Sequence, residues 1–330
     1  MTVPPRLELA LLPTPILKLE RLSRRLGIEL YVKRDDLTGL LESGGEVRKL
    51  EFLAADALAQ GADTLITCGR AQSNACRAVA AVAARLGCRA VIAVEGEPPE
   101  GYDGNLLLGR MLGAEVHYLI APGGRRAAGV LDDLAAQVRA GGGRPYLIPE
   151  GGANEVGALG YLEGAVELAE QINHGAPRFD TVVIAAESGA SQAGLLMGKH
   201  LAGLPSEIVG VPVTDRADVV RGRIAGIIDT AIRRFGFAID VPKAIHLLDG
   251  YQGRDGGGVA EEDLRAVVDL ARDEGILLDS EVTIKAFRGL LDTLGRDAKA
   301  MGQRICFIHA GGPFSLFPFR GRLSSLLDQI

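Results

Sequence analysis

The carboxylate Glu46 stands between a glycine-rich loop and an expected helix in the segment Leu37–Leu53, LTGLLESGGEVRKLEFL. Glycines let the backbone approach a ligand closely, and the apolar residues that follow at helical spacing predict a helix. A carboxylate in an apolar cleft has a raised pKa and can move protons near neutral pH, so Glu46 is a candidate general acid or base. The alternative is a structural ion pair between Glu46 and Arg70, Arg48 or Lys49.

Two other acidic residues, Glu150 and Glu187, also stand close to glycines in the sequence. If their carboxylates converged with that of Glu46, the three could hold a hard divalent cation. Sequence spacing does not require them to converge, and the four cysteines form no CxxC pair. We therefore expect no metal site and reduced cysteines.

Alternating strands and helices are expected to position these residues. Short apolar runs predict strands at 29–33, 64–68, 90–94, 115–119, 145–148, 181–185, 207–213 and 304–309. Helical spacing predicts helices at 48–60, 71–86, 105–111, 129–140, 189–201, 218–233, 261–274 and 282–294. The alternation predicts an α/β fold with mostly parallel strands. The glycine-dense run Gly253–Gly258 is expected to form a mobile loop near a ligand cleft.

Composition narrows the class of function. The chain has 330 residues, 47% of them hydrophobic, and a net charge of −6, which suits a large α/β enzyme. The charges are spread without a basic run, which argues against nucleic acid and anionic membrane surfaces as partners. No run approaches the roughly 18 apolar residues of a membrane span, and the N-terminus has no secretory signal pattern. We expect a cytoplasmic protein that binds a small molecule.

The segment Arg34–Glu51 carries a resemblance to a known family. It reads RDDLTGLLESGGEVRKLE and is similar to RDDLTGLALGGNKTRKLE in the 1-aminocyclopropane-1-carboxylate deaminase and D-cysteine desulfhydrase family of pyridoxal-phosphate enzymes. In that family the lysine after the asparagine forms a Schiff base with the cofactor. The two segments align without a gap, so Glu46 stands where the Schiff-base lysine is expected.

Further segments extend the resemblance over nearly the whole chain, namely Leu65–Gly87, Ile148–Tyr161, Val182–Gly194, Gly275–Ala286 and Phe307–Gly312. The resemblance implies that Ser73 and Asn74 meet the substrate carboxylate and the cofactor at a helix start. Ser73 is thus a second candidate catalytic residue. Gln72, Arg70 and Glu150 are expected to line the same substrate site. Without the resemblance, we would prefer to read Ser73-Asn74 as a helix cap.

The resemblance also implies a loop whose backbone amides cradle the cofactor phosphate at another helix start. Its residues are Glu187, Ser188, Gly189, Ala190, Ser191 and Gln192. Glu187 stands at a glycine of the family, and a carboxylate there would repel a phosphate dianion. Val282 stands at the tyrosine that neighbours the substrate in the family.

The fold that the resemblance implies is the two-domain α/β fold of the tryptophan synthase β-like enzymes, fold type II. Each domain is expected to contain a mostly parallel sheet flanked by helices. A larger domain would comprise residues 1–50 and 158–330, and a smaller one residues 51–157, with the ligand cleft between them. Pyridoxal phosphate is the implied cofactor, and a homodimer is the implied assembly.

Three functions are consistent with these residues. The first is an enzyme that has lost covalent pyridoxal phosphate and acts on a small amino-acid-like or carboxylate substrate by acid/base chemistry at Glu46. The second is a noncatalytic protein that binds a ligand. The third is a lyase or deaminase, similar to D-cysteine desulfhydrase, that retains the cofactor.

Overall fold

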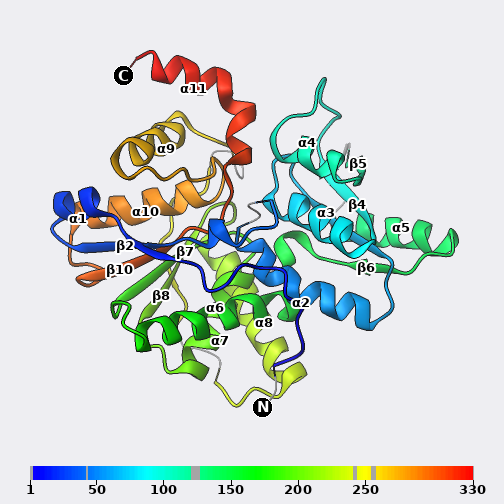
Figure 1. Cartoon of the computed structure of the whole chain (residues 1–330), viewed down its shortest axis with the longest axis horizontal. Coiled ribbons are helices and arrows are strands. Elements are labelled where there is room, and N and C mark those ends of the chain that lie inside the picture. Colours follow the sequence, from blue (N-terminus) through cyan, green and yellow to red (C-terminus); the bar gives the residue numbers. More distant parts are fainter. Residues whose placement is uncertain (1–2, 42–43, 120–126, 241–243, 254–257, 330) are drawn as a thin grey trace.

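Two sheets with helices packed against them form the molecule (Figure 1). The computed structural model describes residues 3–41, 44–119, 127–240, 244–253 and 258–329. Two residues of the loop before Glu46, at positions 42 and 43, and most of the predicted loop Gly253–Gly258 lie outside the described residues.

The larger sheet has six strands in the order β1-β2-β10-β7-β8-β9. They are β1 (Ile16–Lys18), β2 (Glu29–Lys33), β7 (Thr181–Ala186), β8 (Glu207–Pro212), β9 (His246–Leu247) and β10 (Arg304–Ile308). β1 pairs antiparallel with β2, and the remaining pairs are parallel. Because neighbouring parallel strands end at the same edge, the loops that follow β2, β7 and β10 lie together.

The smaller sheet has four parallel strands in the order β5-β4-β3-β6. They are β3 (Thr64–Gly69), β4 (Arg89–Glu95), β5 (Glu115–Leu119) and β6 (Pro145–Leu147). All six residues of β3 are buried, as expected for a parallel strand that is covered on both faces. The loop that follows β3 therefore has a fixed origin in the core.

Helices cover both faces of each sheet (Figure 1). On the larger sheet, α6 (Glu155–Asn173), α7 (Ala190–Ala202) and α8 (Ala217–Phe235) cover one face, and α1 (Glu20–Leu26), α9 (Glu261–Glu274) and α10 (Thr283–Arg296) cover the other. On the smaller sheet, α3 (Asn74–Leu86) and α5 (Ala127–Ala140) lie on opposite faces. The chain also forms α2 (Glu46–Ala59), α4 (Gly104–Met111) and α11 (Arg320–Leu327).

Helix α2 lies between α3 and α6 and so connects the two sheets. Gly160 of α6 allows this close approach, since a Cβ there would lie 2.4 Å from the Arg48 carbonyl oxygen. Gly194 of α7 does the same against α6, because its Cβ would lie 2.1 Å from the Ala158 carbonyl oxygen. These backbone contacts fix the first turn of α2, which carries Glu46, against the larger sheet.

The predicted strands and α-helices agree with the structure except at some ends and in five omissions. The strands at 29–33 and 115–119 and the helix at 261–274 have the predicted bounds. The helix predicted from residue 71 begins at Asn74, because Ser73 caps it. The sequence interpretation omitted β1, α1, α6, β9 and α11.

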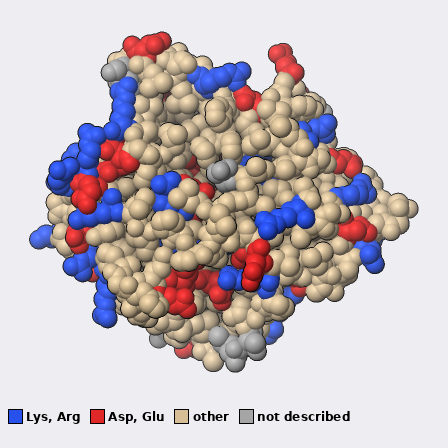
Figure 2. Space-filling model, in the orientation of Figure 1, with Lys and Arg blue, Asp and Glu red and all other residues tan. Residues whose placement is uncertain are grey.

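Acidic and basic side chains are interspersed on the face that Figure 2 shows. None of the described helices combines the length and the apolar character needed to cross a membrane. We propose that each sheet with its helices forms one of the two predicted domains.

Candidate functional site

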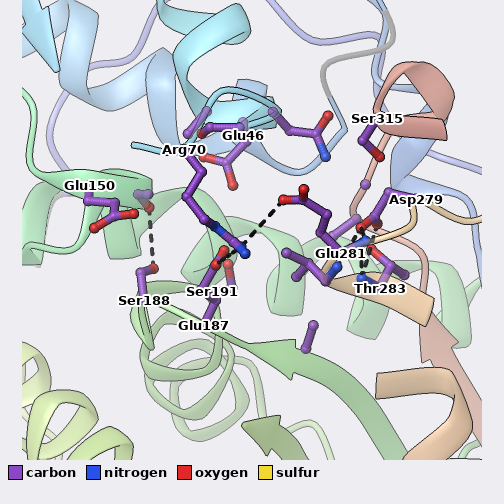
Figure 3. A pocket seen from close by; sticks show the side chains of 18 of the residues that line it. Glu46, Arg70, Glu150, Glu187, Ser188, Ser191, Asp279, Glu281, Thr283 and Ser315 are labelled. Atoms are coloured by element: carbon purple, nitrogen blue, oxygen red, sulfur yellow. Dashed lines mark hydrogen bonds and ion pairs between the residues drawn. The ribbon is translucent and has the colours of Figure 1, made fainter. Parts of the chain in front are cut away.

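A cleft lies at the carboxyl ends of parallel strands from both sheets (Figure 3). Its walls come from the first turn of α2, from the loops after β3, β6, β7 and β10, and from the turn before α10. Ligands of open α/β sheets bind at this edge because loops, rather than continuing strands, form it. The cleft is therefore the candidate ligand site.

Glu46 is the first residue of α2, and its side chain lines the cleft. Lys49, one turn further on, donates from Nζ to Glu46 Oε1 at 2.6 Å and to the Gly151 carbonyl oxygen at 2.7 Å. The Lys49 side chain is only 4% exposed and that of Glu46 is 21% exposed. Of the three ion-pair partners considered from sequence, the described contacts thus give Lys49.

Arg48 points away from Glu46 into a buried network. Its guanidinium binds Asp35 Oδ1 at 2.9 Å and both carboxylate oxygens of Glu167 at 2.9 Å. Lys33 Nζ donates to the same Glu167 at 2.5 Å. Each charge of this network has a partner of opposite sign, which is the condition for burying charges, and the network holds α2 against α6.

Arg70 crosses the cleft and joins the two sheets (Figure 3). It follows β3 of the smaller sheet, whereas Glu187 follows β7 and Glu281 precedes α10, both beside the larger sheet. Arg70 Nη2 lies 2.8 Å from Glu187 Oε1 and 3.5 Å from Glu281 Oε2. The sequence interpretation did not select Glu281. The sequence did contain a signal for it, because Glu281 is an acidic residue directly beside Val282. We had interpreted that segment by its apolar positions.

Burial and neighbouring acidic groups raise the pKa values of several carboxyls in the cleft. Burial, together with the neighbouring Glu187 and Glu95 carboxylates, raises the pKa of Glu150 to about 7, and Arg70 partly opposes this. Burial is also the main cause that raises the pKa values of Glu187 and Glu281, again against the attraction of Arg70. Glu150 is thus a carboxyl that exchanges protons near neutral pH, a property typical of acid/base residues.

The predicted substrate residues Gln72, Ser73 and Asn74 line the cleft, but their side chains also hold the local fold. Ser73 is the N-cap of α3, and its Oγ accepts from Cys76 N at 3.2 Å. Asn74 Oδ1 accepts from the side chains of Arg77 and Asn105 at 3.1 and 3.0 Å. The cap interpretation of Ser73 is therefore confirmed. The N-terminus of α3 faces the cleft and suits an anion such as a substrate carboxylate.

The predicted phosphate loop is only partly at the cleft. Glu187, Ser188, Gly189 and Ser191 line it, and Ser188 Oγ donates to the Gly151 carbonyl oxygen at 3.3 Å. Ala190 and Gln192 are fully buried and are not among the residues that line it. The Gln192 amide instead donates to the His246 carbonyl oxygen at 3.0 Å, because the first turn of α7 directs it toward β9.

Carboxylates gather in the cleft without forming a metal site. Among the described residues, no group of three or more His, Cys, Asp or Glu side chains is arranged to hold a metal ion. The carboxylate of Asp279 is used as a helix cap, with Oδ1 accepting from Val282 N at 2.7 Å and from Thr283 N at 3.1 Å. All four cysteines are free thiols.

The residues of the cleft do not fit a pyridoxal phosphate held by a Schiff base at the first turn of α2. Glu46 cannot form that bond. Among the described residues that line the cleft, Lys49 is the lysine, and its Nζ already donates to Glu46 and to the Gly151 carbonyl oxygen. Arg70 and Glu187 meet at the start of the loop that would hold the phosphate. The remaining cavity has a volume of about 80 Å³ for the centres of water molecules.

Comparisons with known proteins identify the family and the fold. Residues 7–311 match the family described as pyridoxal-phosphate dependent enzymes. A D-cysteine desulfhydrase of Yersinia enterocolitica is 43% identical over 320 residues, which cover 96% of each chain. A D-cysteine desulfhydrase of Klebsiella pneumoniae is 42% identical over 325 residues, which cover 97% of each chain.

Solved structures agree with these relatives. A homologue of 1-aminocyclopropane-1-carboxylate deaminase superposes with a TM-score of 0.88 and 34% identity, over 98% of this chain and 96% of that chain. An L-serine ammonia-lyase of Rhizomucor miehei, with a TM-score of 0.68 and 17% identity over 97% of this chain and 99% of that chain, shares the fold. The predicted fold class and family resemblance are confirmed. The chain belongs to the family of pyridoxal-phosphate dependent enzymes.

Proposed function

We propose that this chain is an enzyme that acts on a small amino-acid-like substrate by acid/base chemistry, without a covalent bond between the protein and pyridoxal phosphate. The observation that carries the proposal is the carboxylate of Glu46 at the first turn of α2, paired with Lys49 inside the cleft. The family's cofactor chemistry begins with a lysine amine. At this position the family has an amine that forms a covalent bond with the cofactor. This chain has instead a carboxylate, held by the neighbouring lysine, that can move protons.

The walls of the cleft assign a direction to the substrate. The N-terminus of α3 takes the substrate carboxylate, because unpaired backbone N–H groups and the helix dipole favour an anion there. Glu46 then exchanges a proton with the bound substrate. Glu150, whose pKa of about 7 lets it hold or release a proton at neutral pH, is the second proton-transfer group.

The first test is spectroscopic. The purified chain is scanned from about 300 to 500 nm, the region of pyridoxal phosphate absorption, before and after addition of the cofactor and then of borohydride. We expect no cofactor fixed by borohydride to Lys49, the lysine in the described lining of the cleft, and peptide mass spectrometry identifies each lysine that is modified. Cofactor fixed to Lys49 contradicts the proposal, whereas modification of exposed lysines, which react with free pyridoxal phosphate in any protein, does not.

The second test measures proton transfer directly. Amino acids of both configurations are incubated with the protein in deuterated water, and exchange at the α-carbon is followed by NMR. We expect Glu46→Gln to abolish the exchange. The matched control is Glu115→Gln, an exposed glutamate on β5 that pairs with Arg89, and it is expected to leave the exchange unchanged. Binding without exchange or turnover would instead support a noncatalytic ligand-binding protein.

A cofactor-dependent lyase is the second candidate function, and two observations favour it. Relatives that match over nearly the whole chain include D-cysteine desulfhydrases, and Lys49 lines the same cleft. In that case Lys49 would have to leave Glu46 to react. Cofactor fixed to Lys49, together with release of hydrogen sulfide, ammonia and pyruvate from D-cysteine, would favour this function over the first.

We also propose a homodimer, which the resemblance predicts. Its measurement is light scattering coupled to size-exclusion chromatography, where a mass near twice 34.7 kDa is expected.

A further inference from the structure

Acidic side chains outnumber basic ones in the described lining of the cleft. Its described lining holds five carboxylates, Glu46, Glu150, Glu187, Asp279 and Glu281, and two cations, Lys49 and Arg70. Two of the carboxylates are used locally. Glu46 is paired with Lys49 at 2.6 Å, and Asp279 caps α10 through three backbone N–H groups.

Three carboxylates then share one guanidinium. Arg70 contacts Glu187 and Glu281, while no ion pair to Glu150 is formed among the described residues. With all three ionised, they carry two negative charges more than Arg70 offsets. Two cations outside the lining, Arg223 and Lys285, oppose the raised pKa values of Glu150 and Glu281 only in part. Burial is the main cause of the raised pKa values of Glu150, Glu187 and Glu281, and the neighbouring carboxylates add to it, since protonation relieves their repulsion. A ligand that brings positive charge would relieve it instead.

The N-terminus of α3 gives the cleft a partial positive charge at another point of its wall. There the backbone of Asn74 and Ala75 begins a 13-residue helix behind the Ser73 cap, and both residues line the cleft. A ligand that fills the cleft therefore meets a site for an anion at α3 and an excess of carboxylates near Arg70. A carboxylate and more than one positive group in the same molecule complement both sites.

We propose that the cleft selects a short amino acid whose side chain carries a second positive charge, such as a primary amine, which binds at the Glu187 and Glu281 carboxylates. The cavity limits the size of the side chain, since its volume for the centres of water molecules is about 80 Å³. The proposal rests on the proposed function only in placing an amino-acid-like ligand in this cleft.

Binding of the second amine changes the proton balance in a defined way. An ammonium group near the three carboxylates favours their ionised forms, so the carboxyls that hold protons in the free protein lose them on binding. A neutral or acidic amino acid of the same length has no such effect. Proton release on binding therefore reports the positive charge of the ligand and does not depend on its shape.

The test is isothermal titration calorimetry of the full chain with three ligands of similar length, 2,4-diaminobutyrate, homoserine and aspartate, each in both configurations. Titrations at pH 7 in two buffers of different ionisation enthalpy report the protons released. We expect 2,4-diaminobutyrate to bind at least about tenfold more tightly than the other two and to release protons. Glu187→Gln and Glu281→Gln are each expected to remove most of this preference, while Glu115→Gln keeps it.

The outcomes separate this inference from the proposed function. If homoserine or aspartate binds as tightly as 2,4-diaminobutyrate, the inferred selectivity is wrong, although the cleft still takes amino acids. If none of the three ligands binds, both the inference and the proposed function are wrong. If the preference survives in Glu187→Gln and in Glu281→Gln, the second amine binds elsewhere and the inferred site is wrong.

Discussion

Removal of Arg70 tests the interactions across the cleft most directly. In Arg70→Ala, Glu187 and Glu281 lose the guanidinium that lies 2.8 and 3.5 Å from them. Two unit charges about 4 Å apart attract by about 1 kcal/mol in water and about 4 kcal/mol near a protein surface. The side chains of Arg70, Glu187 and Glu281 are 27%, 35% and 15% exposed, so solvent screens both pairs. We expect the free energy of unfolding at pH 8 to fall by about 2 kcal/mol in total.

The loss should depend on pH, and its sign follows from the pKa shifts. The pKa values of Glu187 and Glu281 are raised in the folded protein. Such groups contribute stability that is fully present below their unfolded pKa and is lost as pH rises through the folded pKa. Without Arg70 the pKa values of Glu187 and Glu281 rise further, so at pH 5 these carboxyls take up protons in the variant. A protonated carboxyl carries no charge, so the loss of the cation destabilises the folded variant less at pH 5. The destabilisation at pH 5 should be about half of that at pH 8, or less.

The assay is urea denaturation followed by circular dichroism at pH 5 and pH 8. The matched control is Arg89→Ala, whose pair with Glu115 at 3.0 Å has a 60% exposed arginine and should contribute about 0.5 kcal/mol or less at either pH. Equal losses for Arg70→Ala at the two pH values, or no loss at pH 8, would refute the reasoning.

Three further changes test the candidate site and its support. The double variant Glu46→Lys with Glu187→Gly restores the amine and the open phosphate loop of the family, so we expect it to gain a pyridoxal phosphate band that borohydride fixes to the new lysine, while Glu115→Lys should gain none. Glu150→Gln should remove the proton release that accompanies binding of 2,4-diaminobutyrate at pH 7, because the pKa of Glu150 lies at about 7; unchanged release would exclude Glu150 as its source. Gly194→Ala should lower the free energy of unfolding by about 3 kcal/mol or more, because the new Cβ would lie 2.1 Å from the Ala158 carbonyl oxygen. Gly222→Ala, in open space on α8, is its control and should be neutral or stabilising.

Local patterns in the sequence carried much of the fold. The strands at 29–33 and 115–119 were predicted with the observed bounds, because short apolar runs between turn residues report strands directly. The long helix α6 was missed. Its glycines lower helix propensity, and the contact of Gly160 with the backbone of α2 is visible only when that helix is in place.

The candidate site divides in the same way. The sequence by itself determined that Glu46, Arg70, Glu150 and Glu187 stand in loops or helix starts beside strands, because these features depend on neighbours along the chain. It also indicated the family, which the relatives confirm.

Only the tertiary structure decided which of these charges meet. It paired Glu46 with Lys49, joined Arg70 to Glu187 and Glu281 across the two sheets, and turned Gln192 away from the cleft. Residues 117 and 211 positions apart, as in the two pairs of Arg70, become neighbours through the order of the strands and the packing of α2 and α6. The separation of two residues along the chain does not determine their distance in space, because the fold can bring residues from distant loops to the same edge of a sheet.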